Sequence, residues 1–213
     1  MSKKLFAEFL GTFTLVFLGA GAIVSGKADL QGVALAHGLA IFVMVSAFAG
    51  TSGAHFNPAV SAAMLATKRI DIQKFSYFVV AQLLGASIAS LTLNIIYGHA
   101  NGYGLPAIAS VSTGAGALAE ILGTALLVFV IFGVAVDKRS AASALPGLPI
   151  GLTISAIIFS VGPITGAALN PARWFGPALV SGDWTNALLY IFAPTIGAVL
   201  AALIYQAVVK PKQ

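Results

Sequence analysis

The sequence predicts an all-α membrane protein with six transmembrane helices and two re-entrant half-helices, built as an inverted internal repeat. Three observations predict this fold class. The 213 residues are 59% hydrophobic and only 8% charged, whereas soluble domains carry about a quarter charged residues. Six apolar stretches approach the roughly 20 residues that a helix needs to cross the hydrocarbon. The tripeptide Asn-Pro-Ala occurs twice, each time within apolar sequence.

The six spans account for most of the chain. In order they are expected at Leu5–Val24, Val33–Gly50, Phe75–Ile96, Ala117–Val136, Gly147–Val161 and Leu188–Val209. The fifth is the shortest and continues into the apolar stretch before the second Asn-Pro-Ala. We therefore expect a single domain over residues 1–213, without a separate soluble domain. No polar segment, short apolar core and cleavage site stand apart at the start, so no cleaved signal peptide is expected.

The formal charge of +5 follows the membrane topology. With six spans, nearly all basic residues fall on one side: Lys3, Lys4, Lys68, Arg69, Lys74, Lys138, Arg139, Lys210 and Lys212. The positive-inside rule makes that side cytoplasmic, so we expect both termini in the cytoplasm and the protein in the plasma (inner) membrane. The basic balance therefore predicts no nucleic-acid partner. The chain has no cysteine, so it can form no disulfide.

An internal duplication relates the two halves of the chain. Three short words recur in order at an offset of 112 or 113 residues: Ala7–Thr12 as Ala119–Thr124, Asn57–Ala59 as Asn170–Ala172, and Leu84–Ala86 as Ile196–Ala198. Each half, about residues 1–105 and 113–213, contains three spans. Because three is odd, the second half enters from the opposite side and the repeat is inverted.

Each half also contains a helix too short to span. Asn57 and Asn170 have the chemistry of a helix start, since an N-cap amide is followed by a proline that lacks the N–H a first-turn residue cannot use. The helices expected at Pro58–Thr67 and Pro171–Val180 would be about 15 Å long at the α-helical rise. Both are therefore predicted to be half-membrane helices.

Extended backbone is expected before each half-helix, over Thr51–Phe56 and Gly162–Leu169. Such backbone survives at membrane depth only when it is buried in protein or lines a wet cavity. The inverted repeat brings the two half-helices together by their positive N-termini at mid-membrane. The amides of Asn57 and Asn170 would donate hydrogen bonds there, and the extended carbonyls would accept them. This arrangement suits a single file of small polar neutral molecules and opposes cations, as channel selectivity requires.

Two Asn-Pro-Ala boxes, Asn57–Pro58–Ala59 and Asn170–Pro171–Ala172, in an inverted six-span repeat resemble the aquaporin or major intrinsic protein family over essentially the whole chain. The resemblance implies a right-handed helical bundle and a homotetramer with one pore per subunit. It also implies an outer selectivity filter, which maps to His37, Ile158, Ala167 and Arg173. A filter of His, Ile, Ala and Arg is similar to those of plant vacuolar members, which implies passage of ammonia as well as water. Glycerol is less expected, because glycerol-conducting members usually carry Asp where this chain has Trp174.

Two glutamates, Glu8 and Glu120, lie within spans at equivalent positions of the repeat. They could form a proton relay or a catalytic carboxylate pair. The favoured interpretation is structural, with each accepting hydrogen bonds from the backbone of its own lead-in loop, because buried carboxylates must be paired or hydrogen-bonded. A relay would also defeat a pore that excludes protons.

The remaining polar residues separate into pore and surface groups. His55 is expected in the inner vestibule and His37 in the pore, although a lone membrane histidine is often only packed. Arg173 is expected in the pore rather than at the membrane surface, since it lies in the first turn of a helix that starts at mid-depth. His99 is expected to be solvated in an outer loop, Tyr97–Ser112, which we predict to hold no site. No cluster has metal-ligand spacing, so neither a metal nor a cofactor is expected.

The function that the sequence predicts is a passive water channel that excludes protons and ions and also passes small neutral solutes such as ammonia or hydrogen peroxide. Its partners would be these solutes, membrane lipid and other copies of the chain. A facilitator of other neutral solutes is the nearest alternative. A secondary transporter also uses inverted repeats and broken helices, but no acidic ion site adjoins the asparagines. An enzyme is not expected, since no nucleophile motif is present, and a purely structural role would not need Arg173.

Overall fold

The structure is a computed structural model that describes residues 1–137 and 139–209. Six helices are long and apolar enough to cross a membrane. They are α1 (Ser2–Val24), α2 (Leu30–Phe48), α4 (Ile72–Tyr97), α5 (Thr113–Ile131) with the π-helical turn η2 (Phe132–Val136), α6 (Gly147–Thr165), and α8 (Ala187–Ile204) with the π-helical turn η4 (Tyr205–Val209). The short helices are α3 (Pro58–Ala66) and α7 (Pro171–Ser181), with the 3-10 turns η1 (Asn101–Gly104) and η3 (Ala141–Ala144).

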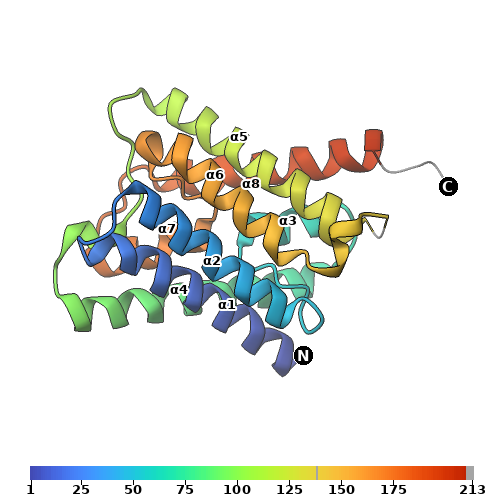
Figure 1. Cartoon of the computed structure of the whole chain (residues 1–213), viewed down its shortest axis with the longest axis horizontal. Helices are drawn as coiled ribbons and strands as arrows, with labels where there is room; N and C mark the ends of the chain where they lie inside the picture. The colour runs from blue at the N-terminus through green and yellow to red at the C-terminus, as the bar shows by residue number, and fades with distance from the viewer. Residues whose placement is uncertain (138, 210–213) are drawn as a thin grey trace.

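The helix packing repeats between the halves. The pairs α1–α4 and α5–α8 correspond, and both pack extensively, while α2 packs on its own counterpart α6. Each half-helix packs against a span of the other half, α3 on α8 and α7 on α4. The expected six spans and two half-helices are therefore confirmed, and their contacts have the two-fold pattern of an inverted repeat (Figure 1).

Glycines permit the closest of these contacts. A Cβ added at Gly85 would lie 2.3 Å from the carbonyl oxygen of Phe9, and one added at Gly197 would lie 2.1 Å from that of Ile121. Small residues at such crossings let helix backbones approach closely. The duplicated glycine thus fixes the same helix crossing in each half.

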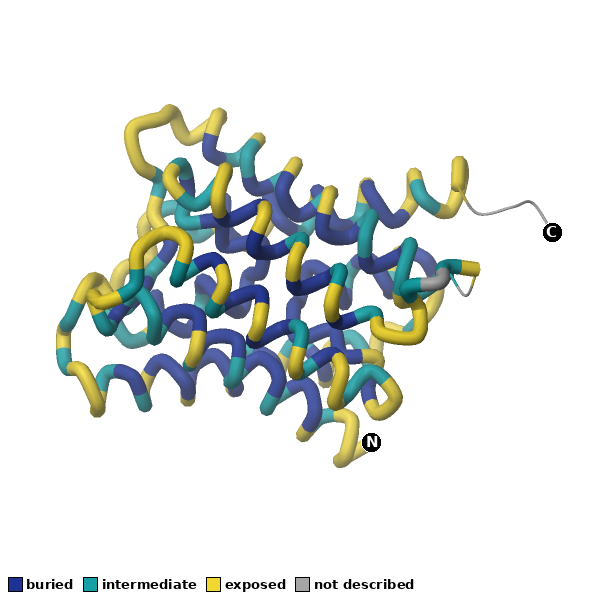
Figure 2. The backbone as a smooth tube through the Cα atoms, viewed as in Figure 1, coloured by how far each residue is buried: buried dark blue, intermediate teal, exposed yellow. Residues whose placement is uncertain are grey.

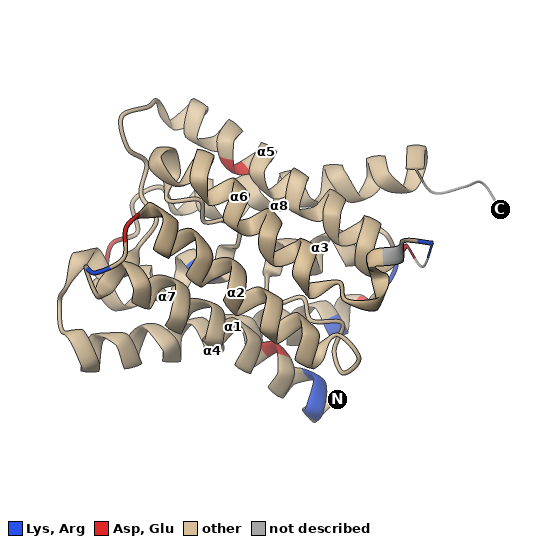
Figure 3. Cartoon of the chain, in the orientation of Figure 1, with Lys and Arg blue, Asp and Glu red and all other residues tan. Residues whose placement is uncertain are grey.

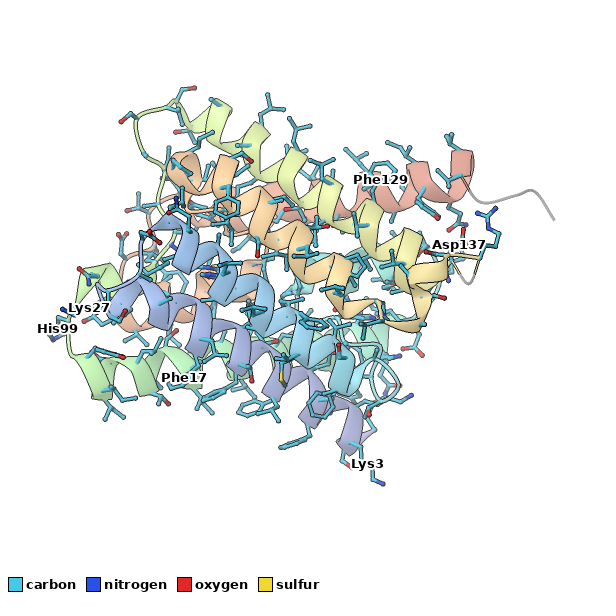
Figure 4. The ribbon with its side chains drawn as sticks, viewed as in Figure 1. Lys3, Phe17, Lys27, His99, Phe129 and Asp137 are labelled. Carbon is cyan, nitrogen blue, oxygen red and sulfur yellow. The ribbon has the colours of Figure 1, made fainter. Side chains whose placement is uncertain are left out.

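Burial follows the expectation for a membrane bundle. Buried residues lie on the helix faces that point into the bundle (Figure 2). The outward faces carry exposed large apolar side chains. Basic residues gather at the end of the bundle where the chain starts (Figure 3). Of the basic residues expected there, Lys138, Lys210 and Lys212 lie outside the described residues. Lys27 and His99 lie at the opposite end from Lys3 and Asp137 (Figure 4).

One expected boundary is wrong. The extended lead-in predicted from Gly162 begins only at Gly166, and the helix continues through Pro163 to Thr165. The last-turn carbonyls explain this, because three of the four find a donor. Gly162 accepts from the backbone N–H of Gly166, Ile164 accepts from that of Ala109, and Thr165 accepts from the hydroxyl of Tyr190 at 2.8 Å. With these carbonyls satisfied, the helix extends one turn further than its composition indicates.

Candidate pore

A cavity of about 250 Å³ runs between the two halves. Its wall includes all four residues expected in the outer filter, His37, Ile158, Ala167 and Arg173, and both box asparagines. At its other end it is lined by Arg69, Lys74 and Val136, near the inner ends of α3, α4 and α5. The inverted topology therefore brings residues from both halves to one cavity within a single chain.

The two asparagines hold the half-helices together. Each is extended, with φ of −156°, and caps its own helix by accepting the backbone N–H of Ala59 at 2.8 Å or of Ala172 at 2.9 Å. The amide nitrogen of Asn57 donates to the carbonyl of Leu169 at 2.8 Å, and that of Asn170 donates to Phe56 at 2.9 Å. An amide nitrogen carries two N–H groups. One on each asparagine is used in these cross-links, so a second is left at the cavity wall.

The lead-in loops follow the same strained path in both halves. Gly53, Ala54 and Phe56 have φ of 97°, 52° and 53°, and their counterparts Gly166, Ala167 and Leu169 have 76°, 44° and 53°. Non-glycine residues rarely adopt such angles, and they persist only where surrounding contacts hold them. Each of the two loops therefore needs contacts that hold its backbone in this conformation.

Glu8 supports the first loop. Its buried carboxylate accepts four hydrogen bonds, from the hydroxyl of Ser52 at 2.6 Å, the backbone N–H groups of His55 at 3.0 Å and Phe56 at 2.7 Å, and the side-chain amide of Gln82 at 2.7 Å. Four donors saturate the oxygens of an ionised carboxylate, which accounts for its burial. These contacts favour loop support over a proton relay.

Glu120 supports the second loop in the same way. It accepts from the hydroxyl of Thr165 at 2.6 Å and from the backbone N–H groups of Ala168 at 2.9 Å and Leu169 at 2.8 Å. Glu8 and Glu120 belong to separate networks on opposite halves of the fold. Their contacts give no support to a catalytic carboxylate pair.

The four residues expected in the outer filter lie on the cavity wall, and their polar groups are only partly paired. Arg173 is 1% exposed, and its guanidinium donates to the carbonyl of Gly104 at 2.8 Å, so it does not reach the membrane surface. His37 donates from Nδ1 to the carbonyl of Val33 at 2.8 Å. The Nε2 of His37 and the Nε of Arg173 are buried without a partner among the described residues.

The ring of His37 lies directly against α1. A Cβ added at Gly19 would fall 2.6 Å from its Nε2. The free nitrogen of His37 is thus packed against the glycine in this conformation, although the residue lines the cavity. The sequence analysis did not identify this contact between Gly19 and His37.

The segment Tyr97–Ser112, in which no site was expected, contacts Arg173. The carbonyl that holds Arg173 belongs to Gly104, and residues 101–104 all have positive φ, which turns that carbonyl inward. The side chain of Asn101 fixes this turn by donating to the carbonyl of Val24 at 3.0 Å. A backbone acceptor has no side-chain signature, and only the glycine-rich sequence of the turn indicated an unusual backbone.

The inner end of the cavity holds His55. Its Nδ1 lies 3.0 Å from the hydroxyl of Ser61, and the side-chain amide of Gln82 donates to the same hydroxyl at 3.1 Å. Sequence reasoning missed Ser61 and Gln82. A serine on the half-helix and a glutamine within a span were the available signals, since polar side chains at membrane depth are uncommon. Within residues 1–137 and 139–209, no group of three metal-ligating side chains is present.

Comparison with known proteins agrees with this geometry. The family model of the major intrinsic proteins matches residues 1–205. The chain is 41% identical over 208 residues to Aquaporin NIP1-1 of Zea mays, covering 95% of this chain and 73% of that protein. It is 40% identical over 206 residues to Glycerol uptake facilitator protein-like 6 of Lactiplantibacillus plantarum, covering 94% and 95%.

A solved structure shows the same fold. The X-ray structure of the aquaglyceroporin from Plasmodium falciparum superposes with a TM-score of 0.89 at 29% sequence identity, covering 99% of this chain and 97% of that one. The match over nearly the whole of both chains extends to the half-helices and loops as well as the spans. The chain belongs to the major intrinsic protein family of membrane channels.

Proposed function

We propose that this channel for water and small solutes conducts water passively and excludes protons and ions. The observation that carries the proposal is the meeting of two asparagine-capped half-helix starts in one cavity, each asparagine retaining an N–H donor. The two helix N-termini add roughly half a positive charge each at that point. Water can accept a hydrogen bond from the amides, whereas a cation meets donors and a positive potential.

The experiment is a pair of flux measurements on proteoliposomes. Stopped-flow light scattering reports osmotic water flow, and an internal pH dye reports proton flow in the same vesicles. We expect water flow well above that of empty liposomes with proton flow unchanged. Water flow equal to that of empty liposomes, in several lipid compositions, would refute the proposal.

We further propose that the filter passes small neutral solutes such as ammonia or hydrogen peroxide. Ile158 and Ala167 give this part of the cavity wall an apolar surface, and the side chain of Ala167 is small. Because Nδ1 of His37 donates to Val33, its Nε2 is a bare acceptor. A solute hydrogen would reach this acceptor when the ring turns from Gly19 toward the cavity. The double variant H37F/I158H should change the ratio of ammonia to water permeability. An unchanged ratio would mean that the filter is formed by other residues.

Glycerol conduction is the second candidate. It is favoured by the likeness to a glycerol uptake facilitator and to an aquaglyceroporin. Trp174 argues against it, because the family resemblance implies Asp at this position, directly after Arg173, in glycerol-conducting members. Glycerol and ammonia fluxes measured on the same vesicles separate the candidates, since we expect ammonia flux to exceed glycerol flux.

An ion-coupled transporter and an enzyme are less well supported. The two buried carboxylates that could serve either are occupied by backbone and side-chain donors. Transport that saturates or follows an ion gradient would favour the transporter.

We propose, from the resemblance to the family, that the channel assembles as a homotetramer. The cavity within a single chain supports one pore per subunit. Light scattering of the protein in detergent, corrected for bound detergent, should give four times the chain mass.

We also propose that both termini face the cytoplasm and that the membrane is the plasma membrane. The basic residues near Lys3 support the orientation.

A further inference from the structure

The inner histidine is held by a chain of side chains that the loop itself does not require. Glu8 binds the amide nitrogen of Gln82 at 2.7 Å, Gln82 donates on to the hydroxyl of Ser61 at 3.1 Å, and Ser61 lies 3.0 Å from Nδ1 of His55. Glu8, Gln82 and Ser61 are all fully buried. The ring of His55 also packs edge-on against Phe78, with centroids 5.2 Å apart.

The hydrogens in this chain can be assigned from its fixed end. The carboxylate of Glu8 accepts, so the atom of Gln82 that faces it is the amide nitrogen, which also donates to Ser61. Ser61 therefore accepts from Gln82 and has its own hydrogen free. Among the described residues the only other partner of that hydroxyl is Nδ1 of His55. Ser61 thus donates to Nδ1, which leaves the ring proton on Nε2.

The Nε2–H of His55 is available to the pore. A Cβ added at Gly53 would lie 3.4 Å from Nε2, and both residues line the cavity. No described group bonds to this nitrogen, and it is not among the polar atoms that are buried without a partner. His37 has the opposite arrangement, because its Nδ1 carries the proton that Val33 accepts.

The second half of the repeat lacks this chain. The positions equivalent to His55, Ser61 and Gln82 are Ala168, Trp174 and Pro194. Glu120 nevertheless holds its loop in the same strained path with three donors. Support of the loop therefore does not explain why the first half has all three residues.

We infer that His55 presents a fixed Nε2–H donor to solutes at the inner end of the pore, and that Ser61 and Gln82 are positioning residues that hold this tautomer. Water and ammonia have a lone pair that can accept from Nε2–H. Ammonium has none, and hydronium accepts poorly. His55 is then a second point of discrimination against cations, on the inner side of the asparagine pair.

Nitrogen-15 NMR of the full chain in lipid bilayers tests the tautomer directly. With ring-labelled histidine, the two nitrogens of each histidine give distinct shifts when bare or protonated. The chain has three histidines, and the variants H55Q and H99A assign their signals. We expect His55 to be protonated at Nε2 and bare at Nδ1, and His37 to show the reverse. A doubly protonated His55, or one protonated at Nδ1, would overturn the inference.

The positioning role is tested with S61A and Q82L. Each removes a link of the chain, so His55 should show a mixture of tautomers. The conservative S61T keeps the hydroxyl and should restore the wild-type signal. The matched control is S87A, a buried serine on α4 whose hydroxyl, within the described part of the chain, bonds only to Leu83 of its own helix. If S61A and Q82L leave the tautomer of His55 unchanged in folded protein, Ser61 and Gln82 do not position the His55 ring.

The transport consequence rests on the proposed function and is measured separately. In proteoliposomes, H55L, which removes the donor, should raise methylammonium leak relative to water flow by about two- to tenfold, the range that loss of one hydrogen bond gives. S61A, which leaves a mixture of tautomers, should raise it less. A leak ratio equal to that of wild type would refute the discrimination, even with the tautomer as inferred. Absence of water flow in the wild type would instead refute the proposed function and leave the NMR result standing.

Discussion

At the residue scale, the centre of the pore depends on a neutral donor at a positive site. Asn170 uses its oxygen to cap α7 and one N–H of its side-chain amide to reach Phe56, which leaves the second N–H at the cavity wall. A carboxylate in its place would keep the cap but lose the donor. It would also add a negative charge where the two helix starts meet.

We therefore predict that N170D raises proton and cation leak at least severalfold over wild type, measured with a pH dye in proteoliposomes. Some loss of folded protein is expected as well, because the cross-link to Phe56 is lost. The control is N186D, which changes the residue before α8, outside the cavity wall. A folded N170D protein with wild-type leak would contradict the electrostatic account.

A second residue-level prediction concerns the packing of His37. Replacing Gly19 by alanine would place a methyl group within 2.6 Å of the ring, which must then move toward the cavity. Because the displaced ring would narrow the cavity that His37 lines, G19A should reduce water permeability severalfold.

The control for G19A is G21A, whose added methyl group would meet only the flexible end of Leu93 at 3.2 Å. Stopped-flow measurements on both variants, at equal protein density, check the prediction. Equal and normal water flow in G19A and G21A would show that the ring of His37 does not limit the pore.

The residues of the pore differed in how far the sequence could predict them. Asn57, Asn170 and the two glutamates stand out because they repeat, and the structure brings each to the loops where it was expected. Their roles in transport remain predictions. Gly104 and Gly19 could not be found this way, since one acts through a carbonyl and the other through the absence of a side chain.

At the scale of elements, the fold relies on backbone contact at equivalent helix crossings. Gly197 of α8 faces the carbonyl of Ile121 on α5, where a rigid backbone atom cannot move aside. Overpacking of this kind costs about 1–3 kcal/mol. The α5–α8 crossing should therefore be sensitive to a single methyl group.

We predict that G197A lowers the thermal midpoint of unfolding in detergent, with a loss of about 1–3 kcal/mol in stability. G114A, on α5, is the matched control, because a Cβ there meets nothing within 4 Å. An unchanged midpoint for G197A would mean that the two helices separate at little cost.

Element boundaries were less predictable than element existence. Apolar length and the repeat were sufficient for six spans and two half-helices. The end of α6 was misplaced because its final turn is stabilised by Ala109 and Tyr190, which are distant in sequence. Local composition, with Pro163 and flanking glycines, indicated only that a helix should stop nearby.

At the scale of the whole molecule, we propose that the end of the bundle that carries both termini faces the cytoplasm. The absence of cysteine makes this testable, because any introduced cysteine is unique. We predict that S2C reacts with a membrane-impermeant maleimide only from the cytoplasmic side, and S112C only from the opposite side. Labelling of intact cells and of inside-out vesicles separates the two cases. The same accessibility for both variants would contradict the six-span topology.

The central claim is that two asparagine-capped half-helices form a pore that passes water and rejects protons. Its most direct test is the simultaneous measurement of osmotic water flow and proton flow in proteoliposomes of the wild-type chain. The account predicts fast water flow with a low activation energy and a proton leak no greater than that of protein-free vesicles. Water flow at the rate of the bare bilayer, or proton flow that rises together with water flow, would contradict it.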